Sequence, residues 1–243
     1  MFSSITKVIN IKLSLLPASR KNITNSNKTV KTNMNPFNDN LHLLKEIFGE
    51  KEVEKKETRL REIFEKTENK WKENTVELGF KKIKYLLICE APPYSETGDP
   101  IYFYNQINSS FHTRIWKAVY PNIKKPSEKE DAFKMLVEKG FLLIDTTPFA
   151  MKYDSKHRKK SAYKEIIKNN IPYLINKLEN NFEIDTNLKI AFGFKLNAKQ
   201  FISVTNGKLK LKDLELNFNE HNIATDGSGF TNSNKPIHIL SLN

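Results

Sequence analysis

The stretch KIKYLLICEAPPYSETGDPIYFYN, residues 82–105, decides the fold class of this chain. It opens with a short apolar run that stops at Glu90, and two prolines, a Gly-Asp-Pro turn and three adjacent aromatic residues follow. A short apolar run bounded by turn residues is typical of a strand that is buried on both faces. Because open parallel sheets bind ligands at the carboxyl ends of their strands, Glu90 and its loop indicate a functional site.

The rest of the chain alternates strands and helices. Candidate strands are residues 85–89, 141–145, 189–192 and 236–240, with a weaker one at 214–218. Candidate helices are residues 111–119, 127–139, 161–180 and 197–203. Short apolar runs separated by helices predict an α/β fold in three layers, α/β/α, around a mostly parallel sheet of four to five strands.

The chain before the first strand divides in two. Residues 1–38 contain no acidic residue and are rich in Lys, Ser, Thr and Asn. This composition suits a flexible basic arm, a targeting segment, or translation from a start upstream of Met34. Residues 39–80 carry apolar residues at helical spacing and predict a helical cover, with Asn38 and Asp39 as candidate N-caps. Residues 81–243 are expected to form the α/β domain.

Charge and cysteine usage limit the partners. The 40 Lys and Arg against 28 Asp and Glu give a net charge of +12, which favours DNA as a partner, although an AT-rich genome would raise the Lys content without any such role. One cysteine, Cys89, excludes a disulfide framework and a four-thiolate metal site, and we expect no metal or cofactor. No run approaches the roughly 20 apolar residues of a membrane span. We expect a monomeric intracellular protein, in the cytoplasm or nucleoid if the host is bacterial.

Two further strands end in informative residues. KGFLLIDTTPFA, residues 139–150, is an apolar run that ends at Asp145, and IAFGFKLNAKQF has Gly193 at a tight strand-to-helix turn. An acidic residue at a strand end also commonly caps the following turn, so a structural role stays open. The chain lacks the glycine-rich motifs of nucleotide hydrolases and dinucleotide enzymes and the nucleophile elbow of α/β-hydrolases, which disfavours these classes.

These three motifs resemble the uracil-DNA glycosylase superfamily. LLICEAPPYSETGDPIYFYN is similar to the first family motif, in which a strand ends in G-Q-D-P-Y-H or G-E-A-P-G, with Cys89 where the family usually has glycine. GFLLIDTTPFA resembles the strand G-V-L-L-L-N-T, whose terminal Asn reads the target base, and KIAFGFKLNAKQF resembles a later strand–turn–helix. The resemblance covers about residues 82–203. It implies a uracil-DNA glycosylase-like fold and base excision from DNA.

The resemblance also implies site residues. A glycosylase extrudes a base and holds it against an aromatic ring, for which Phe103, or Tyr104 in a shifted register, is the candidate. Glu90 would orient the attacking water, with Asp99 in reserve on the same loop. Pro92 and Asp145 complete the expected base-binding set. Core or edge packing is the alternative for the aromatic cluster.

Relatives close their site with an H-P-S-P-like loop, which this sequence lacks. His221, as the leaving-group stabiliser or a surface residue, and Asp226 are the catalytic candidates in the corresponding region. Ser228 and Phe230 are the DNA-contact candidates, with Phe230 as a wedge or a hydrophobic anchor. A basic cluster is expected either to bind phosphates or to form a solvated loop. It comprises Lys152, Arg158, Lys159 and Lys160.

The sequence therefore predicts a monofunctional DNA glycosylase. The alternatives are an inactive glycosylase-like module that binds DNA or protein, and an N-glycosidase of free nucleosides or nucleotides. Uracil-removing relatives have Asn where this chain has Asp145, and an ionised Asp only accepts hydrogen bonds. It would therefore favour an amino-bearing base such as a modified cytosine, in repair or in defence against viruses with modified DNA. A protonated Asp145 would instead donate like Asn, and a cap on the turn 146–148 is the third reading.

Overall fold

The computed structural model describes residues 35–107, 109–211, 214–218 and 224–225, and all of them belong to one compact unit. The helices are α1 Pro36–Phe48, α2 Glu50–Glu77, α3 Ser110–Val119, α4 Lys129–Glu138, α5 Ser155–Lys159, α6 Ser161–Asn181 and α7 Lys195–Thr205, with a 3-10 turn η1 at Phe103–Asn105. The strands are β1 Lys82–Cys89, β2 Phe141–Asp145, β3 Glu183–Phe192, β4 Lys208–Leu211, β5 Leu214–Asn217 and β6 Ala224–Thr225.

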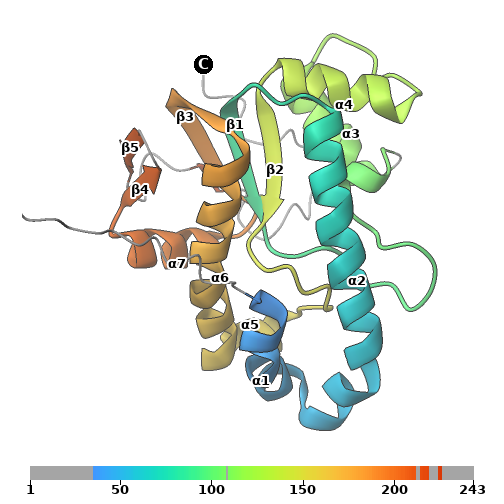
Figure 1. The fold of residues 1–243 in the computed structure, drawn as a ribbon, viewed down its shortest axis with the longest axis vertical. Coiled ribbons are helices and arrows are strands. Elements are labelled where there is room, and N and C mark those ends of the chain that lie inside the picture. The colour runs from blue at the N-terminus through green and yellow to red at the C-terminus, as the bar shows by residue number, and fades with distance from the viewer. Residues whose placement is uncertain (1–34, 108, 212–213, 219–223, 226–243) are drawn as a thin grey trace, which may run out of the picture. The chain divides into compact units, whose positions relative to one another are not determined.

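A parallel sheet in the order β2-β1-β3-β6 forms the centre (Figure 1). Three strands of five to ten residues make up this sheet, and β6 adds two residues at the edge. The α/β class with a parallel sheet is confirmed, but within the described residues the sheet has three full strands and not the four to five that were expected. In the register, Cys89 pairs with Asp145 and Ile88 with Phe192, so the three long strands end side by side.

The expected weak strand at 214–218 does not join this sheet. It forms β5, which pairs with β4 in a separate antiparallel hairpin. Asn206 and Gly207, with φ of 52° and 68°, adopt the left-handed conformation after α7 and turn the chain. A Cβ atom at Gly207 would lie 2.7 Å from the Phe218 carbonyl oxygen, so this turn has no room for a side chain. The other C-terminal candidate, residues 236–240, lies outside the described residues.

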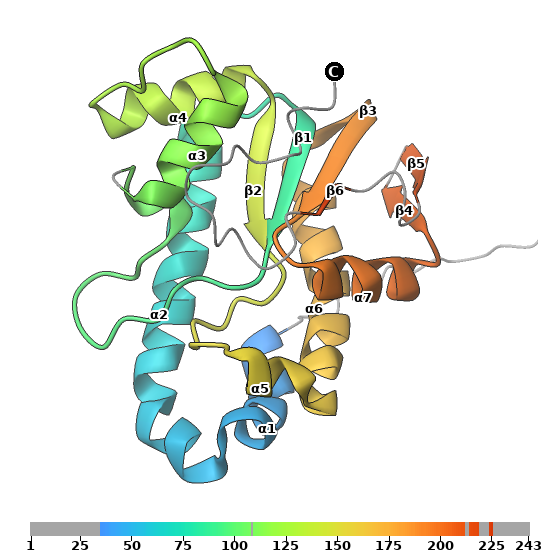
Figure 2. The same cartoon turned by 180° about the vertical axis from the view of Figure 1, so that it is seen from behind.

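Helices flank the sheet. α2 and α6 lie in front of it in Figure 1 and behind it in the reverse view of Figure 2. In Figure 2, α3 and α4 lie in front of α2, and α7 lies in front of α6. The central strand β1 is therefore covered, and its residues from Leu86 to Ile88 are fully buried. Among the helices of the described ranges, none is both long enough and apolar enough to cross a membrane.

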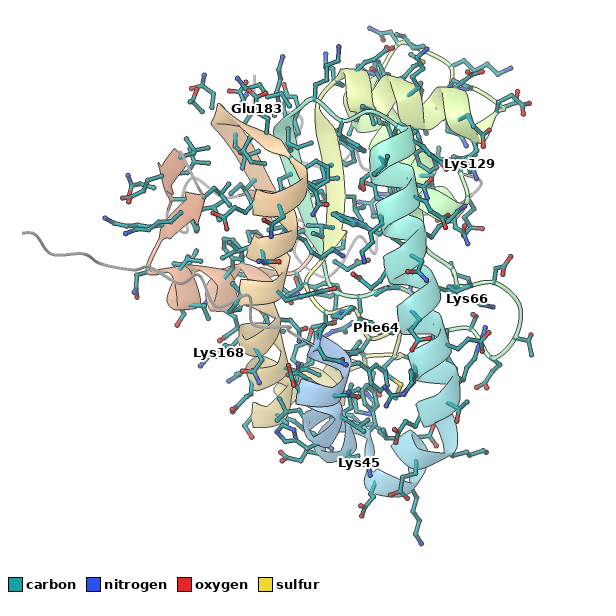
Figure 3. The ribbon with its side chains drawn as sticks, viewed as in Figure 1. Lys45, Phe64, Lys66, Lys129, Lys168 and Glu183 are labelled. Atoms are coloured by element: carbon teal, nitrogen blue, oxygen red, sulfur yellow. The ribbon has the colours of Figure 1, made fainter. Side chains whose placement is uncertain are left out.

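The N-terminal helices start earlier than expected. α1 begins at Pro36, and the side chain of Asn35, not of Asn38 or Asp39, caps it by accepting the Asn38 N–H at 3.2 Å. Proline favours the first helical position because it has no N–H to leave unpaired there. Phe64 points from α2 toward α1, where its ring centroid lies 5.7 Å from that of Phe37 (Figure 3).

Candidate functional site

The carboxyl ends of the three long strands surround a pocket of about 400 Å³, which we call the strand-end pocket. Glu90 after β1, Asp145 at the end of β2 and Phe194 after β3 all line it. Phe103 and Phe111 add aromatic wall from the segments that follow β1. The pocket therefore combines two carboxyl groups with mainly apolar, aromatic walls, a composition suited to a flat heteroaromatic ligand with polar edges.

Hydrogen bonds between the loop after β2 and the end of β1 fix the two strand ends. The N–H and the hydroxyl of Thr146 both donate to the Cys89 carbonyl at 2.8 Å, and those of Thr147 both donate to the Glu90 carbonyl at 3.0 Å. Asn197 in turn donates to the Thr146 hydroxyl at 3.0 Å. In the described part of the chain, no hydrogen bond joins the Asp145 carboxyl to the turn after it, so the capping role finds no support there.

The carboxylate of Glu90 is held by two neighbours. Arg158 donates from Nε to Oε1 at 2.7 Å and from Nη2 to Oε2 at 2.8 Å. The Tyr163 hydroxyl also donates to Oε1. The hydrogen bond to Glu90 raises the pKa of Arg158, and burial, followed by the charge of Glu90, raises the pKa of Tyr163. Because a carboxylate oxygen can accept two hydrogen bonds, Oε2 retains capacity for one more donor.

Asp145 has a different environment. Burial raises the pKa of its carboxyl to about 7, and the charges of Glu68 and Glu90 act in the same direction, while Lys177 opposes them. Both the acid and the carboxylate are therefore populated near neutral pH. Asp145 can offer the pocket a hydrogen-bond donor in one state and only acceptors in the other.

Phe103 is the aromatic residue of the 102–104 cluster with a defined stacking partner. Its ring lies parallel to that of His112, with centroids 4.7 Å apart and an angle of 5° between the planes. The two His112 ring nitrogens lie 2.7 Å from the Phe103 carbonyl oxygen and 2.6 Å from the Ser109 hydroxyl. Burial lowers the pKa of His112, which favours a neutral ring at neutral pH. The Phe103 ring therefore has a fixed orientation at the pocket wall.

Two predicted residues lie elsewhere. The Tyr104 hydroxyl donates to the Leu143 carbonyl at 3.0 Å and accepts from the Leu143 N–H at 2.9 Å, so this side chain packs against β2 and does not line the strand-end pocket. Asp99 lines a neighbouring hollow beside α2 and is not brought together with Glu90. Pro92, in contrast, lines the strand-end pocket.

The predicted basic cluster divides. Arg158 turns inward to Glu90, and its guanidinium carbon lies 4.5 Å from the centre of the Phe194 ring. Lys160 donates to the carbonyls of Glu46 and Ile47 at the end of α1, at 2.9 and 2.6 Å. Lys152 and Lys159 are exposed.

His221, Asp226, Ser228 and Phe230 lie outside the described residues. Sequence reasoning missed Tyr163, which lies on the apolar face of α6 as an ordinary core residue would. It also missed Phe194, whose position directly after β3 was the available signal, as for Glu90 and Asp145.

No protein-family model, no curated protein and no solved structure matches this chain.

Proposed function

We propose that this protein is a DNA glycosylase that binds one flipped-out base in the strand-end pocket and hydrolyses its N-glycosidic bond. The observation that carries the proposal is the meeting of Glu90, Asp145 and Phe103 at one pocket. These residues come from two motifs about 40 to 55 positions apart, and the family resemblance gave each of them a role at the same base.

The dimensions and composition of the pocket support a single base as ligand. A volume of about 400 Å³ lies within the range of roughly 300–1,000 Å³ typical of small-molecule sites. Aromatic walls suit a base, because an extruded base is held by stacking against its faces and by hydrogen bonds to its edge. The net charge of +12 suits a DNA backbone, which is bound through its phosphates.

Glu90 is suited to the hydrolytic step. As the bond between the sugar C1′ and the base nitrogen breaks, the sugar gains positive charge and the base leaves with the electron pair. A carboxylate held in place beside the sugar stabilises that charge and orients the water whose oxygen bonds to C1′. Arg158 and Tyr163 hold Glu90 in this role, and its Oε2 can accept a hydrogen bond from the water.

Asp145 is suited to reading the base edge. As an acid it donates to a base carbonyl, and this hydrogen bond strengthens as negative charge develops on the departing base. As a carboxylate it accepts from an exocyclic amine. Since its pKa is raised to about 7, we propose that the acid form reads carbonyl edges such as that of uracil and the ionised form reads amino edges such as that of a modified cytosine.

The test is base release from single- and double-stranded DNA that carries uracil or modified cytosines, scored as strand breaks that appear only after alkali or heat. We expect release by the parent protein and a fall of at least about 100-fold in Glu90→Gln. Lys168→Met, an exposed change on α6, serves as the control and should leave release unchanged. Release that is undiminished in Glu90→Gln, with its fold verified by circular dichroism, would contradict the role of Glu90.

One observation favours a second candidate, a glycosylase-like module that binds a flipped base without cleaving it. Both carboxylate oxygens of Glu90 already accept hydrogen bonds from Arg158, which limits their access to water. Binding to DNA with a mismatched or modified base, together with no release of any base tested, would favour this candidate.

A further inference from the structure

Asp145 also lines a second, much smaller cavity behind the strand-end pocket. This rear cavity, of about 20 Å³, lies between α2 and α6, which Figure 1 shows on the same side of the sheet. Its polar side chains come from Thr67, Glu68, Trp71, Tyr102, Asp145, Tyr173 and Lys177. Four residues line both spaces and form the partition between the strand-end pocket and the rear cavity: Pro92, Tyr102, Leu143 and Asp145.

A shielded ion pair forms one wall of the rear cavity. Lys177 Nζ lies 2.9 and 3.1 Å from the two carboxylate oxygens of Glu68, and each side chain is only 13% exposed. The Tyr173 hydroxyl donates to Glu68 at 2.5 Å, and Lys177 Nζ lies 4.0 Å from the centre of the Trp71 ring. A buried ion pair adds little net stability, because desolvation offsets the attraction between the charges. Stability alone is therefore a weak reason for two charges at this place.

Unpaired polar atoms surround the same cavity. Thr67 Oγ1, Trp71 Nε1 and Tyr102 Oη are buried, and each is without a hydrogen-bond partner within the ranges that the structure describes. All three residues line the rear cavity. A buried polar group without a partner costs about 1–3 kcal/mol, and a cavity needs only about 10–15 Å³ to hold one water. The rear cavity has both the size and the polar lining for a bound water.

We propose that Lys177 is a positioning residue for Asp145, and that with Glu68 and a water held in the rear cavity it decides whether Asp145 meets the bound base as a hydrogen-bond donor or as an acceptor. The inference depends on the proposed function only for the identity of the ligand. Asp145 thus faces the ligand on one side and a set of fixed charges on the other.

The sign of each neighbouring charge sets the direction of its effect on the ionisation of Asp145. Lys177 on α6 favours the carboxylate, whereas Glu68 on α2 and Glu90 after β1 favour the acid. The hydroxyls of Tyr102 and Tyr104 also lie near enough to interact electrostatically with Asp145. Removing the Lys177 cation should therefore shift Asp145 toward the acid, and removing the Glu68 anion should shift it toward the carboxylate.

The decisive experiment follows the titration of the Asp145 carboxyl in the full chain, by 13C NMR of labelled aspartate assigned with Asp145→Asn. We expect the midpoint to rise by about one pH unit or more in Lys177→Met and to fall in Glu68→Gln. Lys168→Met removes an exposed cation from the same helix and should leave the midpoint in place. A midpoint in Lys177→Met equal to that of Lys168→Met would overturn the proposal.

Two further arms keep the outcome clear. If Lys177→Met fails to fold, the double variant Glu68→Gln/Lys177→Met removes both charges and takes its place. Its Asp145 midpoint should lie between those expected for the two single variants. An Asp145 midpoint below that of Glu68→Gln would contradict the proposal. The second arm measures release of carbonyl-edged bases against pH, and in Lys177→Met the activity should persist to higher pH. If the NMR midpoint moves while no variant releases any base, the proposed function fails and the control of Asp145 by Lys177 stands.

Discussion

Glu90 and Asp145 occupy equivalent places, each at the carboxyl end of a neighbouring parallel strand, but they have opposite surroundings. Glu90 receives two hydrogen bonds from Arg158 and one from Tyr163. Asp145 receives none from the described residues, and burial raises its pKa to about 7. The two carboxyls therefore differ in the partners that the helices around the strand ends supply, since Arg158 lies on α5 and Tyr163 on α6.

The largest expected loss of stability comes from removing the partner of Glu90. Arg158→Met leaves the Glu90 carboxylate, which is 12% exposed, without its counter-charge, and we expect a loss of about 3 kcal/mol in the free energy of unfolding. Urea denaturation measures it. Glu90→Met/Arg158→Met removes both charges and should recover most of the loss. A change below about 1 kcal/mol in the single variant would mean that Glu90 does not depend on Arg158.

Asp145→Asn, unlike Arg158→Met, should raise the free energy of unfolding. The native pKa of about 7 lies above that of an unfolded Asp, so the native state binds more protons between about pH 4 and pH 7, and the stability of the parent falls as the pH rises through this window. Asn does not titrate. The variant should match the parent near pH 4 and exceed it above pH 7 by up to about 4 kcal/mol. Thermal unfolding across this range is the measurement, and a pH-independent difference would refute the raised pKa.

The smallest of the three effects concerns the second partner of Glu90. Tyr163→Phe removes the hydroxyl that donates to Oε1 but keeps the buried ring, and we expect a loss of about 1.5 kcal/mol, typical of a hydrogen bond to a charged group. Tyr173→Phe, which removes the corresponding hydroxyl from Glu68, is the matched control for loss of a buried phenol. If Tyr163→Phe is as stable as the parent, Arg158 alone holds Glu90.

The strand-end carboxyls could be predicted from the sequence because apolar runs that stop at Glu90 and Asp145 mark where buried strands end. The partners of these groups could not be predicted in the same way. Arg158 is 68 residues from Glu90, and its position in a basic run indicated a phosphate contact, whereas its side chain forms an ion pair. Lys177 has the spacing of a core position on α6, but only the packing against α2 brings it to Glu68.

The edges of the fold were less predictable than its centre. The central strand was expected at residues 85–89 and extends from Lys82, and β3 was expected at 189–192 and starts at Glu183. The polar residues at the start of β3 obscured the strand pattern, and the pairing with β1 has a register shift between Ile83 and Tyr85. The pattern at 214–218 indicated a strand correctly but carried no information on which strand it pairs with.

The hydroxyl of Tyr104 has a consequence for contacts between copies of the protein. Among the strands that the structure describes, β2 is the outer one on its side of the sheet, and the backbone N–H and carbonyl of Leu143 face away from β1, toward Tyr104. Exposed edge groups of this kind are a template for pairing with a strand of another molecule, which is a route to aggregation. By bonding to both groups, one phenol takes the place of a neighbouring strand at that point. An aromatic side chain thus protects the sheet edge at Leu143.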